Sequence, residues 1–151
     1  MKKEIANLQE MMSFAEKLGK LLCGGELIEL VGDVGAGKTT FVKGLALGLE
    51  VGDNIQSPSF TINRTYDGRD NLKLSHYDFY RLESAGIMQN ELSEDLDDKN
   101  TVTVIEWGEI VNNVLPDDYI QIMIMPTSDE GRMLDISARG SRYQVIIEEL
   151  K

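Results

Sequence analysis

The feature that most constrains the fold is an eight-residue turn, Gly32–Thr39, with the sequence GDVGAGKT. It matches the pattern G-x-x-x-x-G-K-[ST], in which glycines let the backbone curl so that several N–H groups point at phosphate oxygens. An apolar run of strand length, Glu26–Val31, precedes the turn, and apolar residues at helical spacing follow it from Lys38 to Leu49. Strand, turn and helix in this order predict an α/β domain with a nucleotide-binding turn.

The side chains of the turn have distinct expected roles. Lys38 adds a cation that can reach the β- and γ-phosphates, and Thr39 offers a hydroxyl to Mg²⁺. The helix that begins here presents the positive end of its dipole to the same phosphates. A glycine-rich turn that binds nothing is the alternative interpretation, and the flanking strand and helix favour the phosphate site over it.

The rest of the chain is expected to alternate helices and strands within one domain, residues 1–151. Asn7 with Glu10 three residues later is typical of a helix N-terminus, and apolar residues then repeat at helical spacing as far as Leu22. The remaining expected elements are strands 60–66, 72–77 and 101–105, a partly helical acidic segment 83–99, a hairpin of 119–125 with 133–137, and a helix 142–150 capped by Ser141 and Gln144. This alternation predicts an α/β sheet with an antiparallel pair at one edge.

Charge and composition narrow the expected partners and compartment. The chain has 15 Lys and Arg against 26 Asp and Glu, a formal net charge of −11, which disfavours autonomous binding to DNA or RNA. No apolar run approaches the roughly 18 residues of a membrane span, and no apolar stretch of a signal peptide follows the N-terminus. Cys23 is the only cysteine, so no disulfide framework or cysteine metal cluster is expected. We therefore expect a cytoplasmic protein without membrane association.

Two acidic residues at the ends of predicted strands are candidates for magnesium and water chemistry. Glu106 directly follows a β-branched run, and the carboxyl ends of strands are where α/β sheets hold their ligands. Magnesium coordination by Glu106 is therefore favoured over a solvated loop position. Asp78 could hold a metal-bound water or act as a base. His76 shares a strand face with Asp78 and could orient it, or it could form only a structural hydrogen bond.

Two further features could contribute to such a site. Pro58 predicts a loop at Ser57–Thr61. The hydroxyls of this loop could contact a γ-phosphate, as those of a switch loop do, or could simply face solvent. Trp107 is the only tryptophan. It either packs in the interior or stacks over the mouth of the site.

Four segments, taken together, resemble the TsaE family (also called YjeE or YdiB), small ATPases of bacterial tRNA threonylcarbamoyladenosine synthesis. The segments are Gly32–Thr40 (GDVGAGKTT), Ser57–Phe60 (SPSF), His76–Leu82 (HYDFYRL) and Ile105–Glu109 (IEWGE). The first is common to many nucleotide-binding proteins, whereas HYDFYRL with IEW behind it is specific. They occur in the order that the family has.

The resemblance implies a P-loop NTPase-like three-layer α/β sandwich with a central mixed β-sheet, and hydrolysis of ATP to ADP with Mg²⁺. It implies that Thr39 and Glu106 hold the metal and that the catalytic residues are Lys38, Asp78 and Glu106. The expected nucleotide contacts are Gly35, Ala36, Gly37, Lys38, Thr39, Thr40, Ser59 and Trp107, and the resemblance adds Arg132. The implied partners are TsaD and TsaB, with tRNA reached only through their complex, whose turnover the ATPase would support.

The sequence departs from the family pattern in two places. Ser59 stands where the family usually has threonine, and the hydroxyl is kept. Met11 stands where the family has a threonine, and its side chain has no hydroxyl to contact a nucleotide.

Three other functions remain as alternatives. A small-molecule kinase would need a substrate pocket and a lid with arginines, but Arg64, Arg69 and Arg81 are scattered along the chain. A GTPase would need N-K-x-D, which is absent. A regulatory adaptor would bind ATP and hydrolyse little of it. Thr39, Asp78 and Glu106 argue against an inert site.

Overall fold

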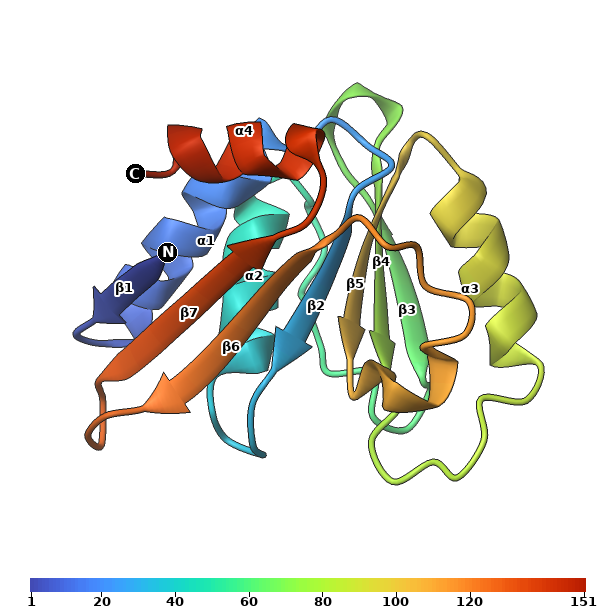
Figure 1. The fold of residues 1–151 in the computed structure, drawn as a ribbon, viewed down its shortest axis with the longest axis horizontal. Helices are drawn as coiled ribbons and strands as arrows, with labels where there is room; N and C mark the ends of the chain where they lie inside the picture. Colours follow the sequence, from blue (N-terminus) through green and yellow to red (C-terminus); the bar gives the residue numbers. More distant parts are fainter.

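A seven-stranded β-sheet forms the centre of the computed structural model, which describes residues 1–151 (Figure 1). The strands lie in the order β1-β7-β6-β2-β5-β4-β3. Their bounds are β1 Lys2–Ile5, β2 Leu27–Val31, β3 Asn63–Asp67, β4 Lys73–Asp78, β5 Thr101–Glu106, β6 Ile120–Pro126 and β7 Arg132–Ala138. The helices are α1 Leu8–Leu21, α2 Lys38–Gly48, α3 Met88–Asp97 and α4 Ser141–Glu149, with short 3₁₀ turns at Arg69–Asn71 and Gly108–Val111.

The middle of the sheet is parallel, and both of its edges are antiparallel. Strand β2 pairs in parallel with β5 and β6, and β5 pairs in parallel with β4. The predicted hairpin of β6 and β7 is present at one edge, and β3 pairs antiparallel with β4 at the other. The sheet is therefore mixed, as predicted, but has antiparallel pairing at both edges. Parallel pairing brings the carboxyl ends of β2, β4 and β5 side by side, at the end of the strands that is here called the carboxyl edge of the sheet.

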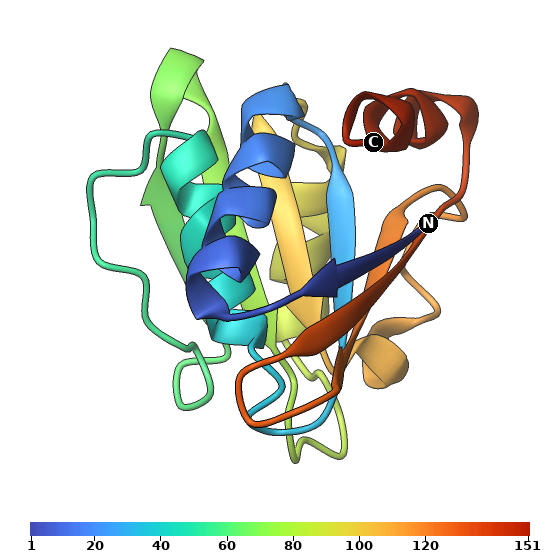
Figure 2. The same ribbon diagram turned by 90° about the vertical axis from the view of Figure 1, so that its left-hand side faces the viewer.

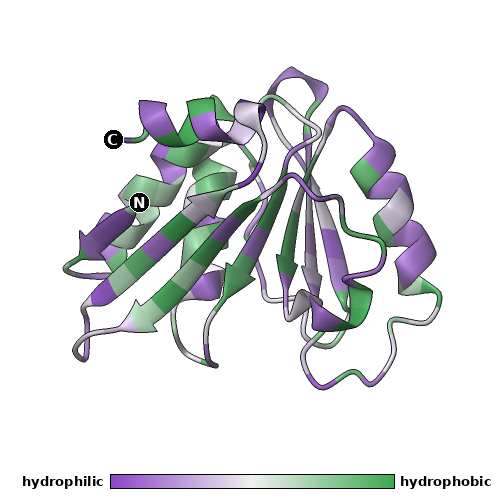
Figure 3. Cartoon of the chain, in the orientation of Figure 1, coloured by the Kyte–Doolittle hydropathy of each residue, from purple (hydrophilic) through white to green (hydrophobic).

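Helices cover both faces of the sheet, so the three-layer α/β prediction is confirmed. Figure 2 shows α1 and α2 side by side on one face. Adjacent residues of one strand belong to different cores, because side chains alternate between faces. Val104 packs in the large core with α1 and α2, whereas Ile105 packs in a smaller core with Leu92 of α3. The same alternation appears as hydrophobic and hydrophilic bands along β6 and β7 in Figure 3.

The structure corrects three local predictions. Strand β1 was not predicted, because its four residues are too few to show a hydrophobic alternation and only Ile5 is fully buried. The strand forms by pairing with β7. Strand β3 begins at Asn63 rather than at residue 60. Helix α4 is present, but Gly140 precedes it without any side-chain cap, so the Ser141–Gln144 cap was wrong.

Two other predictions at helices are confirmed. Asn7 caps α1, accepting a hydrogen bond from the Glu10 backbone N–H at 2.9 Å. The acidic segment 83–99 is partly helical, with Leu92 as the buried side chain of α3. No helix in the structure combines the length and the hydrophobicity that a membrane span requires.

Glycines allow α1 and α2 to approach closely, and this contact sets the position of the helix that follows the phosphate turn. A Cβ built on Gly48 would lie 2.3 Å from the Glu16 carbonyl oxygen of α1. We expect Gly48→Ala to lower the free energy of unfolding by about 1–3 kcal/mol, because the backbones must separate. Urea denaturation measures this loss.

Gly52→Ala is the matched control, because a Cβ there meets nothing within 4 Å. We expect this variant to keep wild-type stability or to gain slightly, since a glycine has been removed from the unfolded chain. Equal stabilities of the two variants would contradict the close-packing explanation.

Candidate nucleotide site

The glycine-rich turn connects β2 to α2 at the carboxyl edge of the sheet. Gly35 and Gly37 have φ of +82° and +113°, values that residues with a Cβ rarely adopt. A Cβ on Gly35 would meet nothing within 4 Å, so the space over the turn is open. Gly37 is the N-cap of α2 and offers no side-chain hydrogen bond. The first N–H groups of the helix therefore remain available to an anion.

Lys38 lies folded back over this turn. Its Nζ donates to the carbonyl oxygens of Gly32 at 2.5 Å and Asp33 at 3.0 Å. The same nitrogen lies 4.8 Å from the centre of the Trp107 ring, within range of a cation–π interaction. The ammonium thus has only neutral acceptors, so an incoming phosphate would offer it a stronger partner.

Two buried carboxylates lie at neighbouring strand ends beside the turn. Asp78 and Glu106 are the last residues of β4 and β5 and occupy paired positions in the parallel register. They are 4% and 3% exposed. The strand pairing thus brings together two acids that are far apart in the sequence.

The contacts of the two acids differ. Asp78 accepts from the Tyr80 backbone N–H at 2.9 Å and from the Ser59 hydroxyl at 2.8 Å. Glu106 Oε1 lies 2.9 Å from His76 Nε2. Sequence analysis suggested that His76 could orient Asp78, and this was wrong. The parallel register of β4 and β5 places the imidazole against Glu106 instead.

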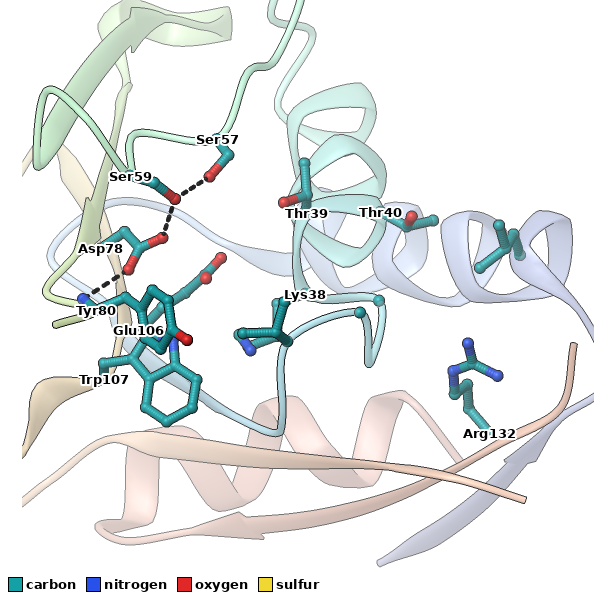
Figure 4. A pocket seen from close by; sticks show the side chains of 14 residues that line it. Lys38, Thr39, Thr40, Ser57, Ser59, Asp78, Tyr80, Glu106, Trp107 and Arg132 are labelled. Carbon is teal, nitrogen blue, oxygen red and sulfur yellow. Dashed lines mark hydrogen bonds between the residues drawn. The ribbon is translucent and has the colours of Figure 1, made fainter. Parts of the chain in front are cut away.

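The loop 57–61 contacts one of the two carboxylates. Ser57 and Ser59 hydroxyl oxygens lie 2.8 Å apart, and Ser59 continues the chain of hydrogen bonds to Asp78 (Figure 4). Phe60, the next residue, is fully exposed. Ser59 therefore belongs to the candidate site and contacts one of its acids directly.

These groups surround one cavity of about 390 Å³. The predicted residues on its wall are Gly35, Gly37, Lys38, Thr39, Thr40, Ser59, Asp78, Glu106, Trp107 and Arg132. Ala36 is buried beneath the turn, with its N–H bonded to the Asp33 carbonyl oxygen. Every other predicted site residue thus faces the same cavity.

Three wall residues were missed by the sequence analysis, namely Leu8, Val34 and Tyr80. The Tyr80 ring lies 5.0 Å from the Trp107 ring, centre to centre. Its place in the HYDFYRL motif, two residues after Asp78, was the available signal. Leu8 is the first residue of α1, and nothing local connects it to the turn.

Arg132 is held in place by backbone carbonyl groups. Its Nε donates to the Ala36 carbonyl oxygen at 2.7 Å, and Nη1 donates to that of Gly131 at 2.8 Å. Figure 4 shows Arg132 at the opposite end of the site from Asp78 and Tyr80. The guanidinium has no carboxylate partner, so its charge is available to a ligand.

The donor set fits a hydrated Mg²⁺. Thr39 and Glu106 supply a hydroxyl and a carboxylate on the cavity wall, and magnesium prefers such oxygen ligands. No group of three or more His, Cys, Asp or Glu side chains could hold a metal by itself. Mg²⁺ is usually bound through one or two carboxylates and completes its shell with water and phosphate oxygens.

Comparison with known proteins gives a consistent result. The family model for the threonylcarbamoyl adenosine biosynthesis protein TsaE matches residues 5–134. The TsaE protein of Bacillus subtilis is 37% identical over 150 residues, covering 95% of this chain and 89% of that one. The Treponema pallidum protein is 38% identical over 129 residues, covering 85% and 94%.

A solved structure extends the likeness to the fold. The crystal structure of Bacillus subtilis YdiB superposes with a TM-score of 0.82 at 33% identity, covering 99% of this chain and 93% of that one. Sequence and fold therefore agree over nearly the whole length. The chain belongs to the TsaE family of tRNA threonylcarbamoyladenosine biosynthesis proteins.

Proposed function

We propose that this TsaE protein is a Mg²⁺-dependent ATPase that acts on the TsaD–TsaB complex and supports its turnover in tRNA modification. One observation carries the proposal. A phosphate-type turn and two buried carboxylates from neighbouring strands converge on a single cavity. A phosphate site alone needs only the turn, whereas hydrolysis also needs groups that hold the cation and activate water.

Each residue has a distinct task in the proposed reaction. The N–H groups of the turn and Lys38 would bind the β- and γ-phosphates, and Thr39 and Glu106 would hold Mg²⁺. The metal, when bound, would neutralise charge on the phosphate oxygens. Asp78 would accept a proton from the attacking water while the oxygen of that water bonds to the γ-phosphorus. The bond to the oxygen that bridges the β- and γ-phosphates breaks, giving ADP and phosphate.

The charge of the chain supports an indirect role toward tRNA. A formal net charge of −11 opposes close approach to a phosphate backbone. The protein would therefore reach the modification reaction through its protein partners.

Among the arginines that a kinase lid could use, Arg69 donates to carbonyl groups at the ends of α1 and α2, away from the turn.

Phosphate release from ATP, measured with and without purified TsaD–TsaB, tests this function. We expect slow release by the chain alone and faster release with the partner pair, and none when EDTA removes Mg²⁺. A phosphorylated metabolite as the product would indicate the kinase instead. Near-zero release in both conditions, with ATP bound, would indicate the adaptor.

A further inference from the structure

His76 is a fully buried imidazole that the proposed reaction does not use. It lies inside β4 with no exposed surface, and it is not on the wall of the cavity. Its Nε2 lies 2.9 Å from Oε1 of Glu106, which does face the cavity. The imidazole therefore supports the carboxylate from behind.

The contact leaves one oxygen of Glu106 free for a ligand. Oε1 has His76 as its partner, and Oε2 has no hydrogen bond. A glutamate side chain rotates about several bonds, and a hydrogen bond to one oxygen fixes which way the other points. Figure 4 shows the Glu106 carboxylate directed into the site.

The contact with Glu106 also indicates which ring nitrogen of His76 carries the hydrogen. A carboxylate oxygen only accepts, so Nε2 must donate its hydrogen to Glu106. In a neutral ring Nδ1 is then an acceptor, and it is buried without a partner. The contact with Glu106 therefore assigns the ring hydrogen to Nε2.

We propose that His76 is a positioning residue, which donates through Nε2 to hold Glu106 in the orientation that binds Mg²⁺. The inference rests on the proposed function, because it assumes that Glu106 is a metal ligand. His76 does not take the proton of the attacking water, since its contact is with Glu106 and not with Asp78. Partners that orient a metal ligand change metal affinity by about tenfold to a hundredfold.

Two substitutions separate hydrogen bonding from packing. His76→Leu keeps an apolar volume without a donor, and His76→Gln keeps an N–H that can reach Glu106. For each variant, ADP binding is titrated against Mg²⁺ by calorimetry, and ADP binding is also measured in EDTA. We expect His76→Leu to raise the Mg²⁺ midpoint by about tenfold or more, with affinity in EDTA unchanged. His76→Gln is expected to restore most of the wild-type midpoint.

Ser75→Ala is the matched control, because Ser75 is equally buried on the same strand and bonds Asp95 on the other face. It should lower the melting temperature and leave the Mg²⁺ midpoint unchanged. A folded His76→Leu with the wild-type midpoint would overturn the proposal for His76 alone. If the ADP affinity of the wild-type protein did not depend on Mg²⁺, the metal site itself would be refuted.

A measurement on the wild-type protein serves if His76→Leu does not fold. The chain has one histidine, so its ring nitrogens give unambiguous ¹⁵N signals by NMR. We expect hydrogen on Nε2 and a shift of that signal when Mg²⁺ and ADP are added. A ring with hydrogen on Nδ1 alone could not donate to Glu106 and would refute the proposal.

Discussion

Lys38→Ala is expected to weaken ATP binding by about a hundredfold or more and to abolish hydrolysis. The wild-type ammonium bonds only neutral carbonyl groups of Gly32 and Asp33. Transfer to phosphate oxygens would replace these with charge-assisted bonds, worth about 1.5–3 kcal/mol each. A factor of ten in affinity is about 1.4 kcal/mol, so two such bonds account for the expected loss. Calorimetric titration with ATP and Mg²⁺ measures it.

Lys43→Ala supplies the control on the same helix. Lys43 is exposed and lines a different hollow, away from the turn, so its removal should leave ATP affinity within about twofold. Removing either lysine changes the net charge equally. Equal effects of the two substitutions would indicate a general charge effect, and wild-type ATP binding by Lys38→Ala would refute the assignment of the turn.

Much of the fold could be predicted because its signals are local. Strand β5 is buried on both faces and therefore reads as a continuous β-branched run. The turn needs glycines at positive φ, so its composition identifies it directly. Placing Glu106 at a strand end followed from chain order alone. These features depend on contiguous residues, and their patterns are visible before any tertiary contact forms.

The contacts that define the site depend on strand register, which the sequence does not show. His76 pairs with Val104 and bonds Glu106 diagonally across two strands, so the sequence could not distinguish Glu106 from Asp78 as its partner. The hydrogen bond from Ser59 to Asp78 spans nineteen positions of the chain. Leu8 reaches the cavity only because α1 packs on α2. Such approaches arise from the packing of whole elements.

The two acids differ in surroundings, and the difference supports separate roles. Glu106 is bonded on one oxygen, by a ring outside the cavity, and keeps the other oxygen free. Asp78 is bonded on both oxygens, and one of these partners is the hydroxyl of a loop residue, Ser59. A ligand that attracts Ser59 would release an oxygen of Asp78 toward water. Metal binding therefore suits Glu106, and proton acceptance suits Asp78.

Asp78→Asn is expected to lower the rate of ATP hydrolysis by about 10²–10⁴, the usual contribution of a general base. The amide keeps an oxygen for the Tyr80 N–H and presents an NH₂ to the Ser59 hydroxyl, which can accept, so the fold should be preserved. ATP affinity and the Mg²⁺ midpoint should both stay within about threefold of the wild type. Single-turnover phosphate release at saturating Mg²⁺ measures the chemical step.

Glu106→Gln is the comparison that makes this result specific. It is expected to raise the Mg²⁺ requirement by about tenfold or more, because a neutral amide is a weaker ligand than a carboxylate. The two variants should therefore differ in kind, with Asp78→Asn slow at any Mg²⁺ concentration and Glu106→Gln partly rescued by excess metal. If instead Asp78→Asn were rescued by Mg²⁺ and Glu106→Gln were not, the roles of the two acids would be reversed. In that case His76 would be supporting the base and not the metal ligand.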